Sequence, residues 1–156
     1  MKVDTLDYKM RIFDYSYVRG KNNSVKHYRQ SVLFIDSKKL GLPAFSMEPE
    51  RLWHRMTIWL GIQDDINFDQ NPKFSKNYRL SGKEEDLIRY YFDDDVLSFF
   101  SVNKNWYLEG INYHLVMYSL RERFHPNVIK TFKGTGTKLH DLFKTHPNAL
   151  DLDQPL

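Results

Sequence analysis

Apolar and aromatic residues alternate with polar ones near the start of the chain, which predicts a long β-hairpin. Residues 8–18 and 25–35 are rich in β-branched and aromatic side chains, as strands are. Residues 20–24 between them are turn formers. Tyr8 and Phe13 lie on opposite faces of the first strand, so both faces carry rings. We therefore expect an antiparallel hairpin that belongs to a larger sheet.

Helical spacing and capping signals predict helices in the middle of the chain. Residues 51–60 follow Pro49 and have apolar positions at helical spacing. Ser81, with Glu84 three positions later, has the pattern of a capping box, which begins a helix by satisfying free backbone N–H groups. Another helix is expected to begin within residues 93–95, because successive aspartates suit the positive end of a helix dipole.

Shorter strands are predicted on either side of these helices. Ile66 and Phe68 alternate with polar residues, as in a short strand. Residues 106–108 and 113–118 predict a second hairpin, with its turn at residues 109–112. Together with the first hairpin, these segments indicate a mainly antiparallel sheet.

The end of the chain predicts one helix followed by a tail. Residues 126–146 are helical in pattern, but Gly134 and Gly136 interrupt them. Glycine costs about 1 kcal/mol relative to alanine inside a helix, so we expect these two to kink or break it. The prediction is a single α+β domain over residues 1–147, its sheet built from two hairpins and packed by helices on one face, with a loose tail over residues 148–156.

Composition and charge narrow the classes of protein. The chain has 156 residues, of which 41% are hydrophobic, which is typical of one soluble folded domain. It has no cysteine, which excludes disulfides, thiol catalysis and Cys-ligated metals. No apolar run approaches the roughly 20 residues of a membrane-spanning helix. Residues 1–40 carry nine Lys and Arg against four Asp, whereas residues 61–100 carry nine acids against five bases, so we expect a basic and an acidic region.

A histidine shortly before residue 61 and several aspartates shortly after it form a candidate metal site. Such side chains are ligands of divalent cations, although their spacing fits neither an EF-hand loop nor the H-E-x-x-H helix. Aspartates that end turns, with a histidine on a helix face, account for the same pattern. A divalent-metal-dependent hydrolase is therefore the alternative function, and its residues are His54, Asp64, Asp65 and Asp69.

The first hairpin interleaves cations with aromatic rings and is the candidate binding surface. Such a surface can contact a protein or anionic lipid headgroups, or it can bind nucleic acid through phosphates and stacked bases. Tyrosines that merely pair across a solvated sheet give the same pattern, and no nucleic-acid-binding signature accompanies it, so nucleic acid is the less favoured partner. The candidate residues are Arg11, Tyr15, Tyr17, Arg19, Lys26, Tyr28 and Arg29.

Residues 61–92 resemble a bacterial family of domains of unknown function. The shared features are a glycine, an acidic-Ile-x-Phe strand, Pro-x-Phe-Ser and Tyr-x-Leu-x-Gly, followed by an acidic helix that contains Arg and ends in Phe. Residues 30–32, 45–50 and 106–110 are similar to the family in the same order. The motif positions in this chain are Gly61, Asp65, Ile66, Phe68, Pro72, Phe74, Tyr78, Gly82, Arg89 and Phe92.

The resemblance implies a domain that usually follows two N-terminal transmembrane helices and has no assigned activity. The chain itself lacks such helices, so we expect a cytoplasmic domain that lies at the inner face of the inner membrane in the full-length protein. Most motif residues suit packing, and Arg89 is expected to pair with Asp65 or another acid. We therefore expect a non-enzymatic interaction module without a cofactor, which binds a protein partner or the headgroup layer.

Overall fold

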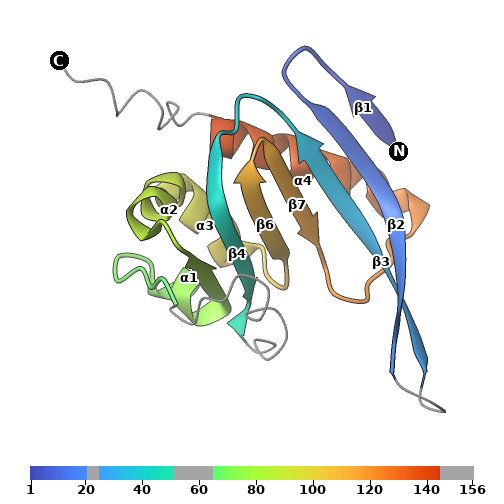
Figure 1. The fold of residues 1–156 in the computed structure, drawn as a ribbon, viewed down its shortest axis with the longest axis horizontal. Coiled ribbons are helices and arrows are strands. Elements are labelled where there is room, and N and C mark those ends of the chain that lie inside the picture. Colours follow the sequence, from blue (N-terminus) through green and yellow to red (C-terminus); the bar gives the residue numbers. More distant parts are fainter. Residues whose placement is uncertain (21–24, 51–64, 145–156) are drawn as a thin grey trace.

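The computed structural model describes residues 1–20, 25–50 and 65–144. This part of the chain forms one antiparallel sheet of seven strands and four helices, which confirms the predicted α+β class (Figure 1). The elements are β1 (Lys2–Asp4), β2 (Lys9–Arg19), β3 (Lys26–Asp36), β4 (Leu42–Pro49), α1 (Pro72–Asn77), β5 (Tyr78–Gly82), α2 (Glu85–Tyr91), α3 (Asp94–Val102), β6 (Tyr107–Asn112), β7 (His114–Tyr118) and α4 (Pro126–Lys144).

The strands lie in the order β1-β2-β3-β7-β6-β4-β5, and both predicted hairpins are present. β2 and β3 pair over eleven residues, but the pairing of β3 with β7 begins only at Val32. Residues 13–19 and 26–31 therefore project beyond the sheet as a two-stranded ribbon, which we call the arm (Figure 1). The second hairpin turns later than predicted, because β6 continues to Asn112, whose positive φ of 51° allows a tight reversal.

One face of the sheet packs against the helices, and the main hydrophobic core lies between the two layers. Helix α4 contacts β2 and β3, while α2 contacts β4 and β5. Because side chains alternate along a strand, every second residue belongs to this core. The sheet residues in it include Met10, Ile12, Leu33, Ile35, Phe45, Met47, Leu80, Leu108, Leu115 and Met117.

The opposite side of the sheet, which we call the open face, carries a smaller cluster of Val32, Tyr107 and Tyr118. Within the described residues, no helix contributes to this cluster. The three clustered residues are buried, and on the arm this face has large exposed side chains, such as Tyr15.

Stacked and edge-on rings fill the core between the sheet and the helices. Phe92 lies 5.0 Å from Phe45 and 5.6 Å from Phe143, measured between ring centroids, and both contacts are edge-on. Such pairs contribute about 0.5–1.5 kcal/mol each beyond the burial of their area. Phe92 thus holds together the end of α2, the strand β4 and the end of α4.

The predicted capping box is wrong, whereas the helix predicted from residue 93 is confirmed. Ser81 lies in β5, and α2 has Glu84 as its N-cap without a side-chain capping bond. Pairing of β5 with β4 outweighs the local signal, because it satisfies several backbone groups at once. At α3, the Asp93 carboxylate accepts hydrogen bonds from the backbone N–H groups of Asp95 and Val96.

The short strand predicted around Ile66 is also wrong. Ile66 and Phe68 lie in irregular backbone, although both are buried and the Ile66 N–H donates to the Leu80 carbonyl at 2.7 Å. The following helix α1 was not predicted; the Asn71 side chain caps it and Pro72 occupies its first turn. The helix predicted over residues 51–60 and the predicted tail lie outside the described residues.

Helix α4 runs unbroken through Gly134 and Gly136, contrary to the predicted kink or break. A Cβ on Gly136 would lie 2.5 Å from Leu33 Cδ1 and 2.9 Å from Met10 Cε, whereas one on Gly134 meets nothing within 4 Å. Gly136 therefore lets the helix approach the sheet closely, and the packing so gained offsets the low helix propensity of glycine.

We expect Gly136→Val to lower the free energy of unfolding by about 1–3 kcal/mol, because the added side chain overpacks a buried contact. Gly134→Val is the matched control and should change stability by less than about 0.5 kcal/mol, since valine and glycine differ little in helix propensity. Urea denaturation of both variants checks this, and equal stability of the two variants would contradict the assigned role of Gly136.

Candidate binding surface

Three tyrosines of the arm form a stacked ladder on the open face. Tyr17 pairs with Tyr28 across the two strands, and their ring centroids are 5.3 Å apart. Tyr15 stacks on Tyr17 at 5.8 Å and is 51% exposed. Because residues two apart on a strand share a face, the register places all three rings on one surface.

Positive charge surrounds this ladder. Arg19 pairs with Lys26 at the end of the arm, on the tyrosine side. The guanidinium carbon of Arg121 lies 4.3 Å from the centroid of the Tyr28 ring, a cation–π distance. The backbone N–H of Arg121 donates a hydrogen bond to Gln30 Oε1, which fixes the turn after β7 against the arm. In the part of the chain that the structure describes, neither Arg19 nor Lys26 forms an ion pair.

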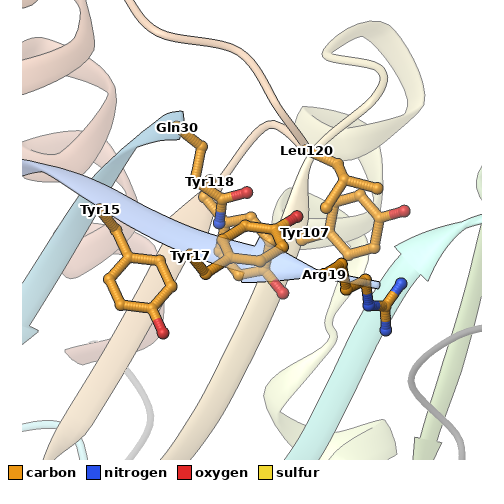
Figure 2. Close-up of a pocket in the computed structure, with 7 residues that line it drawn as sticks. All are labelled: Tyr15, Tyr17, Arg19, Gln30, Tyr107, Tyr118 and Leu120. Atoms are coloured by element: carbon orange, nitrogen blue, oxygen red, sulfur yellow. The ribbon is translucent and has the colours of Figure 1, made fainter. Parts of the chain in front are cut away.

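A cavity of about 270 Å³ lies between the arm and the ends of β6 and β7 (Figure 2). At its inner side, Tyr107 and Tyr118 stack almost parallel, with centroids 5.1 Å apart and an interplanar angle of 6°. The cavity thus combines aromatic surface with one cation and one amide. Its lining residues are Tyr15, Tyr17, Arg19, Gln30, Tyr107, Tyr118 and Leu120.

Two carboxylates lie on the same face of the sheet. Glu109 accepts a hydrogen bond from the Tyr118 hydroxyl at 2.9 Å. Glu48 is only 4% exposed, and its Oε2 accepts no hydrogen bond from any described residue. Burial raises the pKa of Glu48 to about 7, although the charge of Arg79, opposite it on β5, acts to lower the pKa. Glu48 therefore changes charge near neutral pH.

The structure gathers most of the residues predicted from the hairpin on one surface. Tyr15, Tyr17, Arg19, Lys26 and Tyr28 lie together on the tyrosine side of the arm, as the register requires. Arg11 shares the face but lies at the base of the arm, where its guanidinium bonds to Asp4. Arg29, which pairs with Ser16, lies on the other face. Sequence reasoning missed Tyr107, Tyr118, Leu120 and Arg121, because only pairing between distant strands brings them to the arm. It also missed Gln30, which lies in the arm itself opposite Tyr15.

The candidate metal ligands are not brought together in the described residues. Asp65 Oδ1 accepts a hydrogen bond from the Leu80 N–H at 3.1 Å, and burial raises the pKa of this carboxyl. Asp69 is exposed. His54 and Asp64 lie outside the described residues, and within the described ones no group of three or more His, Asp or Glu could hold a metal ion.

The motif positions that resemble the bacterial family lie mainly in the core. Gly82 is a point of close approach, since a Cβ there would be 2.6 Å from the Ala44 carbonyl oxygen. Arg89 pairs with Glu85 at 2.7 Å and donates to the Asn67 carbonyl, not to Asp65. Gly61 lies outside the described residues. The buried positions are Ile66, Phe68, Phe74, Tyr78, Gly82 and Phe92.

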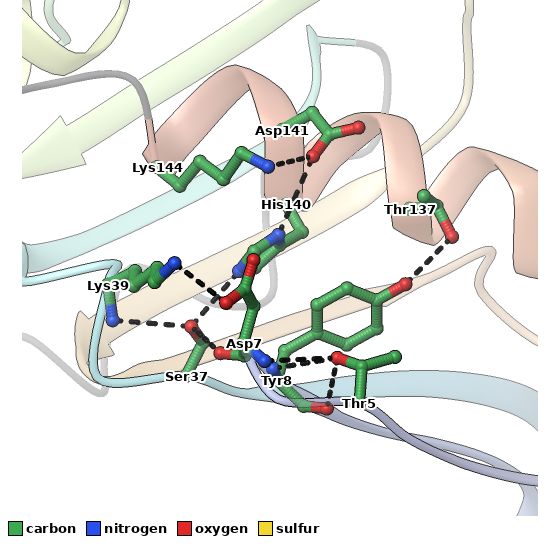
Figure 3. A network of polar contacts seen from close by, with 9 residues as sticks. All are labelled: Thr5, Asp7, Tyr8, Ser37, Lys39, Thr137, His140, Asp141 and Lys144. Carbon is green, nitrogen blue, oxygen red and sulfur yellow. Dashed lines mark hydrogen bonds and ion pairs between the residues drawn. The ribbon is translucent and has the colours of Figure 1, made fainter.

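Ser37, His140 and Asp141 meet across the fold in an arrangement that superficially resembles a catalytic triad (Figure 3). His140 Nε2 lies 3.0 Å from Ser37 Oγ. The Ser37 hydroxyl, however, donates at 2.7 Å to the carbonyl of Asp7, so the histidine must be the donor to the serine. Ser37 is also only 3% exposed. A serine that accepts from its histidine and cannot reach solvent is not an activated nucleophile.

The same network joins the N-terminal strands to α4. His140 is fully buried and its ring lies 4.4 Å from that of Tyr8. Burial lowers the pKa of His140, and Lys144 lowers it further, while Asp141 and Asp7 act in the opposite direction. The Asp141 carboxylate lies 3.8 Å from its Nδ1, a distance too long for a hydrogen bond (Figure 3). The histidine is therefore held neutral, as a structural hydrogen-bond donor.

Comparison of the chain with protein-family models, with curated proteins and with solved structures gives no match. The resemblance to the bacterial family thus stays a prediction from the sequence. None of the helices in residues 1–20, 25–50 and 65–144 is long and apolar enough to span a bilayer.

We expect the free energy of unfolding to decrease as the pH falls below about 6.5, the pKa of an unperturbed histidine. The unfolded chain then binds a proton at residue 140 that the folded chain takes up only at lower pH. His140→Gln should remove this part of the pH dependence, whereas the control His125→Gln, at an exposed position, should keep it. Urea denaturation between pH 5.5 and 7.5 measures it, and an unchanged slope in His140→Gln would exclude this role.

Glu48 should have the opposite pH dependence. Its folded pKa of about 7 exceeds the usual 4.5, so the folded chain binds more protons between these pH values and loses stability as the pH rises. Glu48→Gln should therefore gain stability relative to the unmodified chain between pH 5 and 8, by up to about 3 kcal/mol. Chemical denaturation at the two pH values tests this, with Glu122→Gln as an exposed control. A difference that does not change with pH would contradict the assignment.

Proposed function

We propose that this chain is a protein-binding module, and that its interface is the tyrosine side of the arm together with the cavity at its base. The observation that carries the proposal is the stacked ladder of Tyr15, Tyr17 and Tyr28 beside that cavity. Tyrosine and arginine are enriched among the residues that dominate binding energy, because they present large rigid surfaces with a polar end. A side chain of the partner would fill the cavity and contact Tyr107 and Tyr118.

The edge of β2 supports an extended partner segment. Both the N–H and the C=O of Ile12 bond to Met1, so they point away from β3. By the two-residue repeat of a strand, the backbone groups of Asp14, Ser16 and Val18 point to the same edge. Among the described residues, no strand pairs with this part of the edge. An added strand would gain backbone hydrogen bonds there, as in β-augmentation.

The charges of the arm support an acidic partner. Arg19 and Lys26 lie on the tyrosine side of the arm without an ion-pair partner among the described residues, whereas Asp14, on the other face, pairs with Arg123. Carboxylates on the partner would neutralise these cations and speed association at low ionic strength. Association with a membrane through a longer chain stays a prediction from the family resemblance.

The test compares the proteins captured by the chain with those captured by a variant of its interface. Tyr15→Ser combined with Tyr17→Ser should weaken binding of the captured partner at least about tenfold, since truncating interface anchors typically costs more than 1 kcal/mol. Tyr113→Ser is the matched control, because Tyr113 is 43% exposed at the opposite end of the sheet. Affinities are measured with purified proteins by biolayer interferometry.

The same variants are tested on vesicles containing phosphatidylglycerol and on a single-stranded oligonucleotide. The proposal is supported if a purified protein partner loses affinity with the arm variant and not with Tyr113→Ser. It is overturned if both variants bind that partner equally well, or if only vesicles or the oligonucleotide distinguish the variants.

A further inference from the structure

A second and larger hollow lies where β4, α1 and α3 end, and it is independent of the arm. Its volume is about 900 Å³, which is within the range of ligand pockets. Polar groups of Asn77 and Ser101 line it, together with side chains at the end of β4. The lining is thus mixed, and the hollow is large enough for a ligand the size of a nucleotide.

Three lysines surround this hollow and give it a net positive charge. Lys73 and Lys76 come from α1, and Lys104 follows α3. Among the described residues of the lining, Glu50 is the one acid. Among the described residues, no carboxylate forms an ion pair with any of the three lysines. Three lysines against one glutamate leave a positive charge on the described lining, which favours an anionic ligand.

The nearby helix ends do not account for these lysines. Lysine often occurs at a helix C-terminus because it satisfies carbonyl groups there. Here the Tyr78 N–H already donates to the Phe74 carbonyl at the end of α1. At the end of α3, the Phe99 carbonyl accepts both the backbone and the side-chain N–H of Asn103. Among the described residues, no hydrogen bond joins the three lysines to these two carbonyls, and all three lysines line the hollow.

We infer that this hollow is a binding site for a ligand with a phosphate chain, such as a di- or triphosphate group. Separate ammonium groups act as point charges, and several of them match the charge spread along a phosphate chain better than that of a single phosphate. Asn77 and Ser101 also line the hollow, and the Asn77 side-chain amide donates to the Ser101 carbonyl at 3.3 Å, which joins α1 to α3 there. The site requires no contribution from the tyrosine surface.

Isothermal titration calorimetry with sodium tripolyphosphate and sodium orthophosphate tests this inference on the whole chain. We expect tripolyphosphate to bind at least about tenfold more tightly than orthophosphate, because it contacts more than one lysine. Lys73→Gln, Lys76→Gln and Lys104→Gln should each weaken tripolyphosphate binding about three- to tenfold, as expected for loss of one partly exposed charge contact. The matched control is Lys130→Gln, which removes an exposed lysine from α4 and should leave the affinity unchanged.

Thermal unfolding of each variant confirms that it folds like the unmodified chain, which is expected for exposed lysines. The inference is overturned if tripolyphosphate does not bind, or binds no better than orthophosphate. It is also overturned if Lys130→Gln weakens binding as much as the three variants at the hollow, since the attraction would then be that of the net charge alone.

Discussion

The pairing of β2 with β3 determines which side chains of this protein face the helices and which stay outside. Over eleven residues each strand places alternate positions on opposite sides. Met10, Ile12, Leu33 and Ile35 enter the core, and the tyrosines take the other side. A slip of one residue would turn Lys9 and Arg11 at the base of β2 towards the helices and expose the aliphatic positions, and it would move the tyrosines to the other side of the arm. The packed core therefore fixes the geometry of the arm, although the arm extends beyond it.

The sequence predicts those parts of the fold that are determined by residues close together in the chain. The first hairpin follows from alternation within each strand, and α3 follows from Asp93 and the apolar positions after it. The same local rules fail at Ser81 and Gly136, because distant partners decide there. Ser81 is held by pairing with β4, and Gly136 is favoured by its contact with Leu33 and Met10.

The candidate surfaces show the same division between local and distant determinants. The ladder of Tyr15, Tyr17 and Tyr28 was predictable, because one hairpin contains all three. Tyr107 and Tyr118 reach the arm only through the order of β3, β7 and β6, which no local pattern in the sequence contains. The lysine-lined hollow likewise joins α1 to the segment after α3, which pack together only in the folded chain.

The edge of β2 beyond Ile12, with which no described strand pairs, affects how copies of this protein behave at high concentration. Free backbone N–H and C=O groups on a strand edge also invite pairing between identical molecules, which is a common start of aggregation. The cations of the arm repel such an approach over about one Debye length. Added salt shortens the Debye length. At high salt and high protein concentration, the charges of the arm therefore no longer keep the β2 edges of two molecules apart.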